Sequence, residues 1–314
     1  CEGMKEKLIV IVGPTAVGKT ALSIEIAKKY NGEIISGDSM QIYKGMDIGT
    51  AKVTEEEKQG IPHHLIDILP PSENYSVAQF QHDVRAAIQS ITAKGKLPIL
   101  VGGTGLYIQS VLYDYQFSKQ ERDDSIQKKI QLEMEEHGAD YLLERLREVD
   151  PEQARKIHPN NKRRLIRALE VYEQTGLTLS DYQKRQSNEM QYDVFLVGLE
   201  MDRALLYDRI NQRIDSMMQD GLLNEVKALY DQQLGDSQAM KAIGYKEFIP
   251  YFRQDQSLEE TVELLKRNSR RYAKRQFTWF KNKLPVHWYS IVPTEKDNVF
   301  QNILQDLAGF LKEK

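Results

Sequence analysis

The sequence predicts an α/β protein whose core is a parallel sheet of the P-loop type, with helices on both faces and an inserted all-helical domain. The apolar residues 8–12 run directly into a loop that fits G-x-x-x-x-G-K-[ST]. Strand and helix patterns then alternate up to residue 101, which is typical of a parallel sheet covered on both faces. From residue 115 to residue 192 the strand patterns vanish and charged amphipathic helices replace them.

The first part of the core, residues 4–114, alternates clear strand and helix patterns. A capping-box pattern, Ser76 with Gln79 three residues later, begins the second helix, which ends at Gly95. A short apolar segment also occupies residues 64–69. We therefore expect strands over 8–12, 33–36 and 97–101, and helices over 20–30 and 76–94.

Strand patterns bracket the helical block at 115–192, so this block is an insertion into one fold. Its helices are expected over 123–137, 139–148, 151–156 and 161–174, the last of them stopped at Gly176. Residues 193–314 then complete the core with strands over 194–199 and 286–291 and helices over 203–219, 222–232 and 258–280.

The glycine-rich loop after the first strand predicts a binding site for a di- or triphosphate. Glycines let consecutive backbone N–H groups point at one phosphate, and the following helix adds the positive end of its dipole. Lys19 would reach the outer phosphate, and the hydroxyl of Thr20 would be placed to bind Mg²⁺. The full loop is Gly13, Pro14, Thr15, Ala16, Val17, Gly18, Lys19 and Thr20.

Further polar residues follow the other strands of the sheet, where ligands gather in open α/β folds. Phosphoryl-transfer enzymes with such a loop place an Asp after a hydrophobic strand, but here residues 97–101 run into glycine, which weakens the kinase interpretation. Asp38 is then a metal ligand, a general base or the cap of a turn. Arg213, on a later helix, could neutralise a leaving diphosphate. His63 and His64 point to opposite faces of a strand, so we expect structural roles for them.

Composition and charge indicate a cytoplasmic enzyme with a nucleic-acid partner. The net charge is only −3, and the single cysteine excludes disulfides and cysteine-ligated zinc. No signal peptide opens the sequence, and no apolar run approaches the roughly 18–20 residues of a membrane span. Positive charge is nevertheless concentrated in two clusters, which favours a polyanion over a solvated helix face. They are eight basic residues within 266–283, interleaved with aromatic rings, and Lys162, Arg163, Arg164 and Arg167.

The ordered set of motifs resembles the tRNA dimethylallyltransferase (tRNA isopentenyltransferase) family, in its shorter, bacterial form. The resemblance runs from about residue 8 to residue 289, and the combination of blocks is highly specific. Longer relatives append a Cys/His zinc finger, for which this chain has no cysteines, so we expect no zinc. The matching blocks are residues 13–20, 38–43, 45–52, 62–67, 75–80, 102–107, 158–160, 163–164, 167–170, 241–247, 270–276 and 278–280.

The resemblance implies transfer of a dimethylallyl group from dimethylallyl diphosphate to N6 of the adenosine immediately 3′ of the anticodon in tRNA. Asp38 would take the proton from the amine, while Lys19, Arg213, Thr20 and Mg²⁺ would assist the departing diphosphate. Contacts to the tRNA bases are expected from Asp38, Ser39, Met40, Gln41 and Thr104. Contacts to the anticodon stem-loop backbone are expected from Lys162, Arg163, Arg164, Arg167, Arg270, Arg271 and Lys274.

Three other functions compete with this one. An adenylate isopentenyltransferase would prenylate free AMP, ADP or ATP, but it would have little use for two basic clusters and a large helical insertion. A nucleoside or shikimate-type kinase would need only the phosphate loop. A non-catalytic RNA-binding protein would not need Asp38 beside an intact Lys19. We therefore expect a Mg²⁺-dependent prenyltransferase that acts as a monomer, since an extended RNA must enter the cleft.

Overall fold

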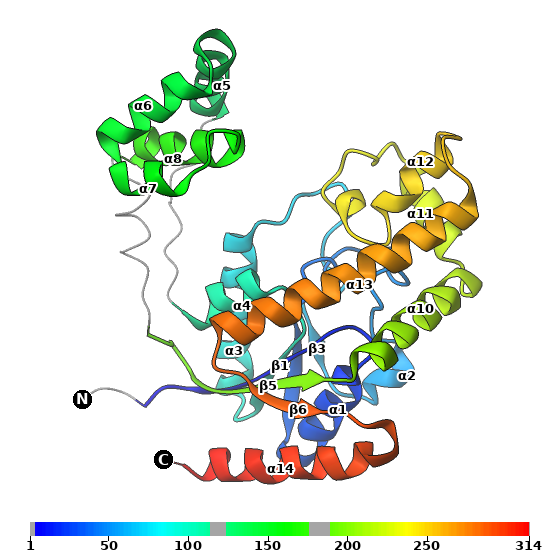
Figure 1. The fold of residues 1–314 in the computed structure, drawn as a ribbon. Helices are drawn as coiled ribbons and strands as arrows, with labels where there is room; N and C mark the ends of the chain where they lie inside the picture. Colours follow the sequence, from blue (N-terminus) through cyan, green and yellow to red (C-terminus); the bar gives the residue numbers. More distant parts are fainter. Residues whose placement is uncertain (1–3, 114–123, 176–188, 314) are drawn as a thin grey trace. The chain divides into compact units, whose positions relative to one another are not determined.

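The structure is a computed structural model that describes residues 4–113, 124–175 and 189–313, and these residues form two compact units. One unit joins residues 1–112 with residues 191–314, and the other is residues 113–190 (Figure 1). The boundaries lie two residues before the expected insertion at 115–192. The expected helix stop at Gly176 and the lone Cys1 fall outside the described residues.

A six-stranded parallel sheet of order β3-β2-β4-β1-β5-β6 is the basis of the first unit. Ile9 of the central strand pairs with Ile99 on one side and with Phe195 on the other, so the two halves of the chain meet inside one sheet. The apolar residues of the central strand are fully buried, which explains its unbroken apolar run. The strands are β1 (Lys7–Val12), β2 (Gly32–Ser36), β3 (His63–His64), β4 (Leu97–Val101), β5 (Asp193–Glu200) and β6 (His287–Ser290).

Helices cover both faces of this sheet (Figure 1). On one face α1 (Lys19–Tyr30) and α14 (Lys296–Lys312) bury Ile26, Phe300 and Leu307 against Ile9 and Ile11. The other face carries α3 (Val77–Ala93), α4 (Gly105–Leu112) and α13 (Leu258–Lys283). The remaining elements of the unit are α2 (Glu55–Lys58), α10 (Arg203–Gln219), α11 (Leu222–Asp231), α12 (Ile249–Phe252) and 3₁₀ turns at Ala239–Lys241, Lys246–Phe248 and Pro293–Glu295.

Most helices begin where the sequence indicates. The capping box of α3 is present: the Ser76 hydroxyl accepts from the Gln79 N–H at 3.1 Å, and the Gln79 side chain accepts from the Ser76 N–H at 2.8 Å. Helices α2, α4, α12 and α14 were not expected from the sequence. Trp279 on α13 is half-buried, and it packs so closely on α4 that a Cβ on Gly105 would lie 2.0 Å from its ring.

Residues 124–175 of the second unit form four helices: α5 (Asp124–His137), α6 (Ala139–Val149), α7 (Pro151–Lys156) and α8 (Lys162–Thr175). They enclose a small core in which Ile130, Leu142, Leu146, Leu165 and Leu169 are the central side chains. Within residues 4–113, 124–175 and 189–313, no helix is both long and apolar enough to cross a membrane.

Glu33 is a buried carboxylate on β2 that lies among a histidine and two lysines. Its oxygens contact His64 Nε2 at 2.7 Å, Lys96 Nζ at 3.1 Å and Lys94 Nζ at 3.3 Å. Burial alone would raise the pKa of Glu33, but these hydrogen bonds outweigh burial and lower it from 4.5 to about 2. The ionised carboxylate therefore stabilises the fold above the pKa of the unfolded chain, and this contribution is lost as the pH falls from about 4.5 to about 2.

We expect Glu33→Gln to lower the free energy of unfolding at pH 7 by about 2 kcal/mol, because a buried acceptor of charged hydrogen bonds is lost. The difference from the unchanged protein should shrink as the pH falls below about 4.5, where the unfolded-state carboxyl gains its proton. Urea denaturation at several pH values measures both effects. A difference that does not depend on pH would contradict an ionic origin.

Candidate functional site

A cavity of about 930 Å³ lies at the carboxyl ends of the strands, within the first unit. The ends of β1, β2 and β4 contribute the phosphate loop, Asp38 and the Gly102–Gly103 pair. Two arginines of α10, Arg209 and Arg213, and Lys296 at the start of α14 also line it. A cavity at this edge of a parallel sheet is where α/β proteins bind their ligands.

The phosphate loop adopts a conformation that its glycines permit. Gly13 has φ 149° and Gly18 has φ 108°, and a Cβ on Gly13 would lie 2.7 Å from the carbonyl oxygen of Leu199. Lys19 Nζ donates to the carbonyl oxygen of Gly13 at 2.6 Å, so the ammonium group lies across its own loop. The hydroxyl-bearing residues Thr15 and Thr20 are both exposed and line the cavity.

Lys19 interacts electrostatically with both the predicted base, Asp38, and the second predicted cation, Arg213. Burial lowers the pKa of Lys19 to about 8, an effect that the charge of Asp38 opposes and that of Arg213 reinforces. Burial also lowers the pKa of the Arg213 guanidinium, against the attraction of Glu57. Lys19, Arg213 and Asp38, which the sequence analysis assigned to one site, line the same cavity.

Asp38 fills one of the three roles that the sequence left open, that of the cap of a turn. Its Oδ1 accepts from the Met40 N–H at 2.9 Å, so the carboxylate caps the turn after β2. Burial raises the pKa of the same carboxyl, against the Met40 N–H and the charges of Lys19 and Lys52. A carboxylate with a raised pKa beside a phosphate loop is a stronger base than a solvated aspartate.

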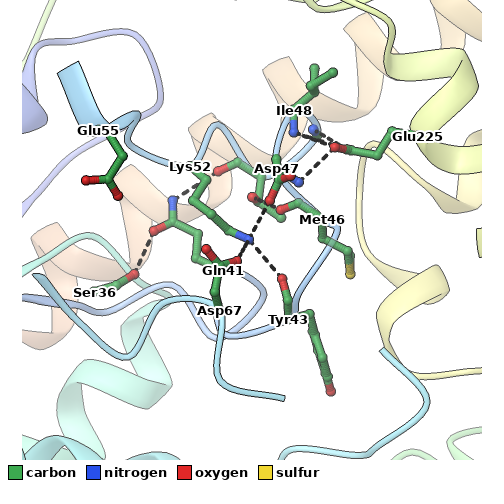
Figure 2. Close-up of polar contacts among 12 residues, drawn as sticks. Ser36, Gln41, Tyr43, Met46, Asp47, Ile48, Lys52, Glu55, Asp67 and Glu225 are labelled. Atoms are coloured by element: carbon green, nitrogen blue, oxygen red, sulfur yellow. Dashed lines mark hydrogen bonds and ion pairs between the residues drawn. The ribbon is translucent and has the colours of Figure 1, made fainter. Parts of the chain in front are cut away.

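The residues predicted to contact bases differ in how accessible their side chains are. Met40 and Thr104 are half-buried, whereas Ser39 is only 8% exposed. The Gln41 amide makes two hydrogen bonds within the protein. Its Oε1 accepts from Ser36 Oγ at 2.7 Å, and its Nε2 donates to the Thr50 carbonyl oxygen at 3.0 Å (Figure 2). Gln41 lines the cavity through a side chain that already has partners.

Several residues of the cavity were not expected from the sequence. Arg209 precedes Arg213 by one helical turn on α10, and this i, i+4 spacing is a signal that could have identified it. Lys52 and Lys296 gave no such signal. Tyr272 on α13 does not line the cavity but interacts with Asp38: burial raises the pKa of its phenol, and the charge of Asp38 adds to the rise.

The basic clusters lie on two helices, one in each unit. On α8, Lys162, Arg163, Arg164 and Arg167 are all exposed. On α13, Arg271 and Lys274 are exposed, whereas half-buried Arg270 donates to Asn211 Oδ1 at 2.7 Å. Arg167 also lies 3.9 Å from a carboxylate oxygen of Glu170. Exposed cations of this kind can bind a polyanion.

The adjacent histidines have structural partners, as expected. His64 binds Glu33, and a ring nitrogen of His63 lies 2.8 Å from the Ile61 carbonyl oxygen. Among the described residues, no group of three or more His, Cys, Asp or Glu side chains could hold a metal ion. A Mg²⁺ ion that keeps several waters and binds mainly to phosphate oxygens would fit beside the exposed Thr20 hydroxyl.

Comparisons with known proteins agree on one family. The IPP transferase family profile matches residues 41–283. The chain is 58% identical to the tRNA dimethylallyltransferase of Oceanobacillus iheyensis, over 99% of both chains. It is similar to the crystal structure of the full-length tRNA isopentenylpyrophosphate transferase of Bacillus halodurans, with a TM-score of 0.76 and 48% sequence identity. This match covers 98% of this chain and 97% of that chain. It is also similar to a eukaryotic dimethylallyltransferase acting on tRNA, with a TM-score of 0.83, 33% identity and coverage of 98% and 79%.

Proposed function

The chain belongs to the IPP transferase family, and we propose that it transfers a dimethylallyl group from dimethylallyl diphosphate to N6 of the adenosine immediately 3′ of the anticodon in tRNA. Its enzyme class is that of a tRNA dimethylallyltransferase, a prenyltransferase. The observation that carries the proposal is the pairing of a phosphate loop with a half-buried carboxylate of raised pKa, Asp38, in one cavity of the first unit.

The phosphate loop would hold the diphosphate of the prenyl donor. Its backbone N–H groups and the start of α1 suit an anion, and Lys19 and Arg213 add two positive charges. Arg209 and Lys296 add two more cationic side chains to the same cavity. This charge balance favours a leaving diphosphate, which becomes more negative at its bridging oxygen as the carbon–oxygen bond breaks.

Asp38 would act as the general base for the nucleophile. The N6 nitrogen forms a bond to C1 of the dimethylallyl group, the bond from C1 to the diphosphate oxygen breaks, and the proton of N6 passes to the Asp38 carboxylate. The exocyclic amine is a weak nucleophile, so a positioned base contributes to the rate. The adenine must leave its stack in the anticodon loop for N6 to meet C1 in line with the leaving group.

The exposed basic residues would contact the backbone of the anticodon stem-loop. The first turn of α8 contains Lys162, Arg163 and Arg164. The positive end of the helix dipole repels cations there, and an RNA phosphate would relieve that repulsion. On α13, Arg271 and Lys274 would make similar contacts, whereas Arg270 is already bound to Asn211. Such phosphate contacts position an RNA without reading its sequence. Ser39, Met40, Gln41 and Thr104, near Asp38, remain the candidates for contacts to the bases.

Mg²⁺ is the proposed cofactor, with Thr20 as its protein ligand. When bound, the ion would neutralise charge on the diphosphate oxygens. We further propose that the enzyme works as a monomer in the cytoplasm, where its tRNA substrate is made and used, and that it takes no zinc.

A transfer assay with radiolabelled dimethylallyl diphosphate and Mg²⁺ tests the proposed function. We expect label to enter unmodified tRNA at the adenosine that follows the anticodon, and to enter AMP only weakly. A parallel reaction with γ-labelled ATP tests for phosphoryl transfer. Label entering AMP in preference to tRNA would make the chain a nucleotide-prenylating enzyme, and phosphate transfer without prenyl transfer would overturn the role of Asp38.

A further inference from the structure

Glu225 is a carboxylate on α11 that binds consecutive backbone N–H groups of a distant loop. We call this loop, residues 45–52, the wall loop because most of its residues line the cavity. Glu225 Oε1 accepts from the N–H groups of Asp47 at 2.8 Å and Ile48 at 2.9 Å, and Oε2 accepts from that of Gly49 at 3.1 Å (Figure 2). Consecutive N–H groups that converge on one anion form a nest, and here the anion belongs to the protein itself.

A second side chain completes the attachment. The hydroxyl of Tyr245 donates to Glu225 Oε2 at 2.7 Å, and the Tyr245 ring covers Gly49 so closely that an added Cβ would lie 2.6 Å from it. Tyr245 is fully buried. The wall loop is therefore fixed by polar and packing contacts from α11 and from the segment that carries Tyr245.

The wall loop is in turn connected to the residues around Asp38. Its Thr50 carbonyl accepts from the Gln41 amide at 3.0 Å, and its Lys52 ammonium donates to the Tyr43 carbonyl oxygen at 2.8 Å. Lys52 also contacts Asp47 at 2.8 Å and forms an ion pair with Asp67 (Figure 2). The Lys52 side chain is only 5% exposed, so its position depends on this network.

We propose that Glu225 is a positioning residue for prenyl transfer, which holds the wall loop so that Lys52 and the cavity wall lie beside Asp38. The inference rests on the proposed function and adds to it a residue outside the cavity lining. The Glu225 side chain is the common acceptor for three adjacent N–H groups, and no neutral side chain of its size offers two such oxygens. Loss of the carboxylate would leave these N–H groups without their acceptor and release the loop.

The charges around Asp38 predict how release of the wall loop would change the pH dependence of the transfer rate. Burial raises the pKa of Asp38, while Lys52 and Lys19 oppose the rise, and the phenol of Tyr272 on α13 faces the same carboxylate. If Lys52 moves away, one opposing charge is lost and the pKa of Asp38 rises further. The acid limb of the rate profile would then move to higher pH.

The experiment measures single-turnover transfer to tRNA at saturating donor for Glu225→Ala and Glu225→Gln, with Glu33→Gln as the matched control. We expect the rate of Glu225→Ala to fall about ten- to hundredfold, as for a displaced catalytic group, with tRNA affinity unchanged and the acid limb shifted upward. Glu225→Gln should lie between this variant and the unchanged enzyme. Glu33→Gln removes another buried carboxylate, one that does not line the cavity, and should lower stability without changing the rate.

A double-mutant cycle with Lys52→Met separates positioning from general destabilisation. If Glu225 acts through Lys52, its replacement should have a smaller effect in the Lys52→Met background than alone. Additive effects, or a folded Glu225→Gln enzyme with the unchanged rate and pH profile, would overturn the inference. Absence of transfer by the unchanged enzyme would instead contradict the proposed function.

Discussion

Asp38→Asn is expected to lower the rate of prenyl transfer about 10²- to 10⁴-fold, the range that a positioned general base contributes. The asparagine oxygen can still accept the Met40 N–H bond that Asp38 accepts at 2.9 Å, so the turn after β2 should persist. What is lost is the basic oxygen that is proposed to take the N6 proton. Single-turnover kinetics with labelled donor measure the rate, and filter binding measures tRNA affinity.

The control for Asp38→Asn is substrate binding. Affinity for tRNA should survive, because the exposed basic residues of α8 and α13 are proposed to supply the electrostatic part of binding. Loss of binding in parallel with loss of rate would mean that Asp38 holds the RNA or the fold, and a nearly unchanged rate would remove it as the base.

Much of the fold could be predicted because local patterns agree with the tertiary structure. The β1 run, the Ser76–Gln79 capping box and the bounds of α7 and α10 follow the sequence closely. Other elements gave weaker local signals. The short α4 begins at Gly105, whose lack of a side chain is required by Trp279, and this is a contact between distant segments that no local pattern can indicate.

The residues of the candidate site likewise fall into two groups, those that the sequence predicts and those that only the structure identifies. Lys19 and Asp38 follow strands, so the rule that ligands gather at strand ends is enough to place them together from the sequence. No comparable rule predicts the positions of Glu225 and Lys52 from the sequence. Their roles depend on a wall loop whose conformation is fixed by hydrogen bonds from α11, and the bonded partners lie 176 to 178 residues apart in the chain.

The phosphate loop predicts the second large effect: Lys19→Met should lower the transfer rate about 10²- to 10³-fold, as for the loss of one preorganised charge on a developing anion. The Lys19 ammonium lies 2.6 Å from the Gly13 carbonyl oxygen, within the loop that would hold the diphosphate. Methionine keeps much of the length of the side chain without its charge. Lys29→Met, at the exposed far end of α1, is the matched control and should keep the unchanged rate.

The pH dependence gives this prediction a second readout. Burial lowers the pKa of Lys19 to about 8, so the free enzyme loses this charge as the pH rises through 8, and kcat/KM for the donor should fall there. A bound diphosphate favours the charged amine, so the alkaline limb of kcat should lie at higher pH than that of kcat/KM. In Lys19→Met the limb near pH 8 should disappear, since the amine that titrates there has been removed from the phosphate loop. Persistence of that limb in the variant would assign it to another group and leave Lys19 without its proposed role in binding the donor.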